Sequence, residues 1–184
     1  AQTEPDAPRY MNLSFLLVPM HQKEIEVRPI VQLTGTSEFN EVFFTGARTA
    51  AENVVGRPGD GWKVAMALLG FERGASTLGQ QIGFENEFKE ILAAARANGK
   101  AKDAVMRQKL ADAWIGLRLV KLNALRNLAE ESPRPGMAAI NKLTWASWHR
   151  AAGELAMEVL GDEAEICADA PYALTRIQSR FLFS

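Results

Sequence analysis

The segment GDGWKVAMALLGFERGASTLGQQI, residues 59–82, has the periodicity of an amphipathic helix. Its apolar residues recur at steps of three and four and would form one face over about five turns; they are Val64, Leu68, Phe71, Ala75, Leu78 and Ile82. The pattern continues through Phe84 and Phe88 to a stop signal at Asn98-Gly99, and Asp60 precedes it as an N-cap. The segment therefore predicts one helix of roughly 35 residues, about 50 Å long.

Two more long helices are expected after it. The first follows Asp103 and ends at the proline-rich stretch 132–136; its predicted inner face is formed by Leu110, Trp114, Leu117, Val120, Ala124 and Leu128. The next runs from Met137 to Leu160 and has Gly161 as its C-cap; its predicted inner face is formed by Leu143, Trp148, Ala152, Leu155 and Val159. Residues 176–184 resemble the start of a fourth helix. Short loops between long helices predict an up-down four-helix bundle.

Residues 10–57 have a different pattern of apolar and polar side chains, which predicts β-strands. Residues 12–17 mostly alternate between apolar and polar side chains, and Ile25 and Val27 do the same in a half-buried strand that ends at Pro29. The absence of crossover helices favours antiparallel strands over a parallel nucleotide-binding sheet. The sequence thus predicts an α+β fold, with the C-terminal half of a β-domain at 1–58 and a helical bundle domain at 59–184.

Composition and charge limit the classes of function that we expect for this protein. The 184 residues carry a formal net charge of −1 and no polybasic run, which gives no electrostatic reason to expect nucleic acid or an anionic membrane as a partner. No apolar run approaches the ~18 residues of a membrane span, and the polar N-terminus predicts no signal peptide. The single cysteine fits a reducing compartment, so a cytoplasmic location is expected. The two histidines lie far apart, and a metal site is not expected.

Glu72 and Arg73, in the middle of the predicted 59–98 helix, are the candidate chemical groups. Glu72 follows Phe71 and would sit about 100° around the helix from the core face. A carboxylate at the edge of an apolar surface is a candidate general base, because desolvation raises its pKa. A solvated surface ion pair is the other interpretation, and the pattern alone favours it.

The sequence resembles the acyl-CoA dehydrogenases. The resemblance rests on Thr34–Phe44, which contains an F-x-x-V connection, on Asn53–Gly56, and on Gly59–Met66, which follows the pattern G-x-G-[FW]-x-x-A-M. The pattern extends over nearly the whole chain and is clearest at residues 34–79. The family has an N-terminal helical domain, a middle β-domain and a C-terminal four-helix bundle. The resemblance implies that this chain holds the second half of the β-domain and most of the bundle.

The resemblance also implies a reaction. The family uses FAD to dehydrogenate an acyl-CoA thioester between its α and β carbons, with a carboxylate removing the α-proton and flavin N5 taking the β-hydride. In some members the carboxylate lies on the first bundle helix directly before an arginine, as Glu72 does here. The resemblance therefore favours Glu72 as the base and Arg73 near the substrate entrance. It places Phe71 in the acyl pocket, with packing in the core as the equal alternative. It further implies an electron-transfer flavoprotein as acceptor and a homo- or heterotetramer.

Two departures from the family concern the flavin. The stretch that corresponds to the family's R-x-x-F-G is Ala95–Lys100, and the stretch that corresponds to Q-x-L-G-G-x-G is Glu158–Ala164. Glu158 and Gly161 are thus the expected cofactor-contacting positions, but Glu158 and Asp162 place negative charge where flavin phosphates would approach. This leaves open a non-catalytic partner subunit of a heteromeric dehydrogenase, or an oxidase of the same fold, beside a catalytic subunit in fatty-acid or sterol side-chain degradation.

Overall fold

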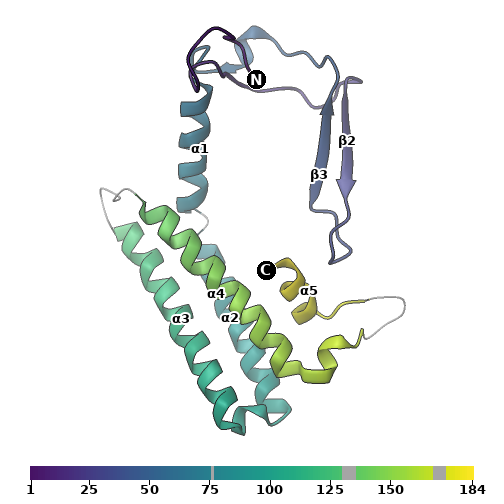
Figure 1. The fold of residues 1–184 in the computed structure, drawn as a ribbon, viewed down its shortest axis with the longest axis vertical. Helices are drawn as coiled ribbons and strands as arrows, with labels where there is room; N and C mark the ends of the chain where they lie inside the picture. The colour runs from purple at the N-terminus through teal and green to yellow at the C-terminus, as the bar shows by residue number, and fades with distance from the viewer. Residues whose placement is uncertain (76, 130–135, 168–172) are drawn as a thin grey trace. The chain divides into compact units, whose positions relative to one another are not determined.

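The computed structural model describes residues 1–75, 77–129, 136–167 and 173–184, and the side chains of residues 72–78 and 138 lie outside this description. The architecture is α+β, with short antiparallel strands followed by helices (Figure 1). The chain divides into two compact units, Ala1–Glu72 and Arg73–Ser184. Each unit is described by itself below.

The strands of the first unit form two antiparallel pairs. β1 (Phe15–Leu16) pairs with β4 (Val54–Val55), and β2 (Ile25–Ile30) pairs with β3 (Phe39–Phe44). The β2–β3 pair is the long ribbon in Figure 1. The predicted antiparallel arrangement is confirmed.

Two predictions about β2 are wrong. Pro29 lies inside the strand, opposite Asn40, and does not end it. A proline is accommodated because each strand of a two-stranded ribbon is an edge and has one side that needs no ladder donor. The strand also lacks the predicted buried face, since Val27 is 48% exposed and Phe44 on β3 is 55% exposed. The reason is that the described residues of this unit provide no second layer over the ribbon.

The start of α1 (Gly61–Ala75) explains the Gly-x-Gly pattern before it. Gly59 has φ of +88°, and a Cβ there would lie 2.7 Å from the carbonyl oxygen of Met11. A Cβ at Gly61 would lie 2.6 Å from the carbonyl carbon of Ser14. Only glycine fits these two close approaches, so the pattern anchors the beginning of α1 against the chain's N-terminal segment.

The second unit is a bundle of antiparallel helices. Its described helices are α2 (Thr77–Ala97), α3 (Ala104–Ala129), α4 (Met137–Leu160) and the short α5 (Arg176–Phe183). α4 packs against α2, α3 and α5, as Figure 1 shows. The predicted bounds of α4 are confirmed, and its C-cap, Gly161, has φ of +63°.

Two helices, α1 and α2, cover the residues of the predicted 59–98 helix. The chain is helical on both sides of Ser76, which lies outside the described residues, so the continuity of the helix stays a prediction. The expected stop is confirmed, because α2 ends at Ala97 and Gly99 has φ of +81°.

The core of the second unit is made by the inner faces of α2, α3 and α4. Leu117 and Val159 are its largest completely buried side chains. Most predicted inner positions are confirmed as buried: Phe84, Phe88, Leu110, Val120, Ala124, Trp148, Ala152 and Leu155. Four predicted inner positions of this unit are wrong, with exposed fractions of 66%, 69%, 46% and 52%; they are Ile82, Leu143, Trp114 and Leu128. They follow the three- and four-residue spacing but are exposed, although one side of Trp114 still meets the core, with its ring 5.5 Å from that of the buried Phe88.

Candidate functional site

Phe71, Glu72 and Arg73 lie in the last part of α1. The boundary between the two compact units falls within this segment, because Glu72 ends the first unit and Arg73 begins the second. The side chains of Glu72 and Arg73 lie outside the described residues, so their roles stay predictions. Phe71 was expected on a buried face, but 77% of it is exposed. A large aromatic ring left exposed on a helix is available to a ligand or to another part of the protein.

The other predicted site residues, Glu158 and Gly161, lie at the end of α4. Here the helix-end carbonyls are already bonded within the chain. Nζ of Lys100 donates to the carbonyl oxygen of Glu158 at 2.6 Å, and Nδ2 of Asn98 donates to the carbonyl oxygen of Val159 at 2.7 Å. These side chains, which come from the turn after α2, cap a helix terminus whose last carbonyls have no partner within the helix.

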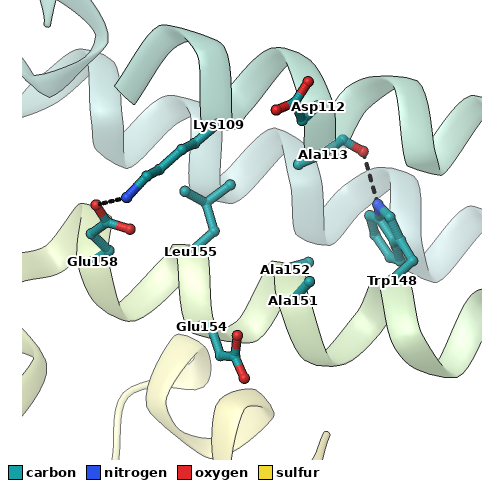
Figure 2. A pocket seen from close by; sticks show the side chains of 9 residues that line it. All are labelled: Lys109, Asp112, Ala113, Trp148, Ala151, Ala152, Glu154, Leu155 and Glu158. Atoms are coloured by element: carbon teal, nitrogen blue, oxygen red, sulfur yellow. Dashed lines mark hydrogen bonds and ion pairs between the residues drawn. The ribbon is translucent and has the colours of Figure 1, made fainter. Parts of the chain in front are cut away.

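The Glu158 carboxylate forms an ion pair with Lys109 of α3. Figure 2 shows this pair at one end of a groove between α3 and α4. At the other end, Nε1 of Trp148 donates to the carbonyl oxygen of Ala113 at 2.8 Å. The groove has a volume of about 340 Å³, and its remaining lining residues are Asp112, Ala151, Ala152, Glu154 and Leu155. Its lining is rich in alanine, and its charged side chains are three carboxylates and one lysine.

A cluster of ionisable side chains around Glu87 and Glu90 of α2 joins this helix to α5 and to α4. Arg176 and Arg180 of α5 both pair with Glu90, and Nε of Arg180 lies 3.6 Å from Oε1 of Glu87. His149 of α4 lies 2.9 Å from the other oxygen of Glu87. Sequence reasoning did not find this cluster. The available signal was a pair of carboxylates three residues apart on α2 and a pair of arginines four residues apart on α5, each pair on one helix face.

Neither a metal site nor a membrane span is found in the described ranges. Within residues 1–75, 77–129, 136–167 and 173–184, no group of three or more His, Cys, Asp or Glu residues is placed to hold a metal ion. None of the helices in that part of the chain has the length and apolar character that crossing a membrane requires.

Solved structures show the same fold. The structure described as "Tcur3481-Tcur3483 steroid ACAD" superposes with a TM-score of 0.85 at 22% identity, covering 98% of this chain and 47% of that one. The ChsE4-ChsE5 complex from Mycobacterium tuberculosis has a TM-score of 0.76 at 23% identity, covering 95% of this chain and 48% of that one. At these identities the likeness defines the fold class alone.

Sequence comparison identifies the family. The family "Acyl-CoA dehydrogenase, C-terminal domain" matches residues 59–180. "Acyl-CoA dehydrogenase IpdE1" of Mycobacterium tuberculosis is 52% identical over 164 residues, which are 88% of this chain and 42% of that protein. The chain belongs to the acyl-CoA dehydrogenase family, and it spans less than half of the length of this relative.

Proposed function

We propose that the full-length protein is an FAD-dependent acyl-CoA dehydrogenase, and that Glu72 is the base which removes the α-proton of the acyl-CoA thioester. The supporting observation is the position of Glu72-Arg73 on α1, the helix that opens the matched C-terminal domain. FAD, when bound, supplies the acceptor for the β-hydride at flavin N5. The α C–H bond breaks toward the carboxylate, and a carbon–carbon double bond forms between the α and β carbons.

Arg73 and Phe71 complete the proposed site. A cation next to the base would orient the carboxylate or bind the polar CoA portion of the substrate by charge-assisted hydrogen bonds. The exposed ring of Phe71 supports a place in the acyl pocket, because it offers an apolar surface that the described residues do not cover. The proposed acceptor of the electrons from reduced FAD is an electron-transfer flavoprotein, and the proposed location is cytoplasmic.

The substrate class is an acyl-CoA from fatty-acid or sterol side-chain degradation. A structure of the same fold is described as a steroid ACAD, which makes sterol-derived thioesters the first substrates to test. The experiment offers purified full-length protein a panel of linear and sterol-derived acyl-CoA esters with an artificial electron acceptor. We expect turnover with at least one ester, and Glu72→Gln should lower it by roughly 10²–10⁴-fold, the range of general acid–base catalysis. Unchanged turnover in this variant would remove Glu72 from the proposal.

A non-catalytic partner subunit is the second candidate, and the outer face of α3 supports assembly with another chain. Ile115, Leu119 and Leu122, spaced four and three residues apart, are 54–57% exposed although α3 also buries its opposite face. A helix that is apolar on two sides is normally covered on both. A similar structure is itself a complex of two components. A colourless protein that gains flavin colour and activity only with a second polypeptide would select this candidate.

A further inference from the structure

The expected flavin-contacting positions, Glu158 and Gly161, lie at the end of α4. We infer that the corner formed by Glu158 and Gly161 is an intrachain clamp between α4 and the α2–α3 turn, and not a subsite for the phosphates of FAD. This inference rests on the proposed function, because it concerns how the flavin of that enzyme is held. It follows that other residues of the assembled full-length enzyme contact the FAD phosphates.

The electrostatics of the corner disfavour an anion. The C-terminus of a helix carries about half a negative charge, because its last carbonyls point outward along the axis. The short 3-10 helix Gly161–Glu165 follows directly and adds the carboxylates of Asp162, Glu163 and Glu165. A diphosphate would meet a helix end and acidic side chains of its own sign, whereas phosphates in proteins are normally found at helix N-termini.

The lysines nearest the corner are already engaged. Lys109 is paired with the Glu158 carboxylate, as Figure 2 shows. The Lys100 ammonium donates to the main-chain carbonyl of the same residue. Each ammonium has three donors, so a phosphate bound here would have to share its lysine with the Glu158 carboxylate or with a helix-end carbonyl.

The space beside Gly161 is also taken. A Cβ at Gly161 would lie 2.7 Å from Nζ of Lys100, so the ammonium occupies the position from which a ligand would approach the bare glycine backbone. The φ of +63° gives a separate reason for glycine here, namely the C-cap of α4. Lys100 and Asn98 together tie the α2–α3 turn to the end of α4.

The test uses full-length protein, with its partner polypeptide if assembly requires one. The variants are Lys100→Met and Lys109→Met, and the control is Lys102→Met, an exposed lysine with no ion pair among the described residues. FAD binding is measured by titrating FAD into the apoprotein, and stability by the thermal midpoint. We expect each clamp variant to keep its FAD dissociation constant within about twofold of the wild type and to lose about 1–4 °C of Tm. The control should change neither quantity.

Different outcomes overturn different claims. FAD binding weakened more than fivefold in Lys100→Met or Lys109→Met, but not in the control, would show that the corner holds phosphate. An unchanged Tm in both clamp variants would show that there is no clamp. If the wild type binds no FAD at all, the proposed function fails, while the Tm comparison still decides whether the clamp exists.

Discussion

The two compact units of this chain bury their apolar side chains to very different extents. In the second unit Leu117 and Val159 are 1% and 0% exposed, whereas in the first unit Val27, Phe39 and Phe44 are 48%, 57% and 55% exposed. The described part of the first unit contributes no buried apolar side chain to the core. A helical bundle closes a core from its own neighbouring helices, but a two-stranded ribbon is only marginally stable alone and needs a covering layer.

The largest expected effect is a cavity in the second unit. Leu117→Ala removes a completely buried side chain from α3, and we expect it to destabilise the bundle by about 2–5 kcal/mol. The matched change in the first unit, Val27→Ala, should alter stability by less than about 0.5 kcal/mol because the side chain is exposed. Native-state hydrogen exchange measures both effects, the first at α3 amides and the second at the amides of the β2–β3 pair. Equal effects of the two substitutions would contradict the contrast between the units.

A pair of glycine substitutions sharpens the comparison within the bundle. A Cβ at Gly116 would lie 2.7 Å from Cδ1 of Trp148, whose ring is held by its hydrogen bond to Ala113. We expect Gly116→Ala to lower the free energy of unfolding by about 1 kcal/mol. Overpacking costs about 1–3 kcal/mol, which exceeds the gain from the higher helix propensity of alanine.

Gly83→Ala is the control for this prediction. A Cβ at Gly83 on α2 meets nothing within 4 Å, so the same change should stabilise by about 0.5–1 kcal/mol. The two variants are compared by the midpoint of urea unfolding. A shift of the same sign in both would show that the described packing around Trp148 is wrong.

A smaller effect is expected from the pair between α2 and α3. The hydrogen bond from Lys121 lowers the pKa of Glu85 below its ordinary value. A carboxyl with a lowered pKa in the folded state adds stability above its unfolded pKa and loses it as the pH falls through the folded pKa. We expect Glu85→Gln to be less stable than the wild type by about 0.2–1 kcal/mol at pH 7. The difference should shrink as the pH falls below about 4.3, the unfolded pKa, and vanish below the lower folded pKa. A pH-independent difference in urea midpoint would exclude this origin.

The smallest effect is expected in the exposed ribbon. The hydrogen bond from Arg28 lowers the pKa of the neighbouring Glu26 carboxyl. Because both side chains are more than half exposed, Arg28→Met should leave Tm unchanged. It should nevertheless return the Glu26 pKa to its ordinary range, which an NMR titration of the carboxyl carbon measures. A fall in Tm would mean that this ribbon contributes more to stability than its exposure indicates.

Helix periodicity predicted the second unit well, since the bounds of α4 and the cap at Gly161 follow from local signals. The errors came from features that local signals do not contain. Leu143 and Leu128 have the spacing of core residues, but a helix that is apolar on two faces does not reveal which face meets its neighbours. Local sequence predicts a strand end at Pro29, whereas an edge position accommodates the proline inside the strand.

The site was less predictable than the fold. No periodicity distinguishes Glu72 from a surface carboxylate, and only the resemblance to a family selected it. The cluster that joins Glu87 and Glu90 to Arg180 depends on contacts between helices about 90 residues apart, which a single sequence does not show. The lysine contacts at Glu158 were missed for the same reason, although the sequence did predict that negative charge there would disfavour a flavin phosphate.

The central claim is that Glu72 removes the substrate α-proton, and rapid mixing tests it most directly. Full-length wild type, Glu72→Gln and the control Glu85→Gln are each mixed without oxygen with an acyl-CoA that the wild type oxidises. The loss of flavin absorbance is followed over a single turnover. The account predicts that Glu72→Gln retains FAD but bleaches roughly 10²–10⁴-fold more slowly, while Glu85→Gln bleaches at the wild-type rate. Bleaching of Glu72→Gln at the wild-type rate would contradict it.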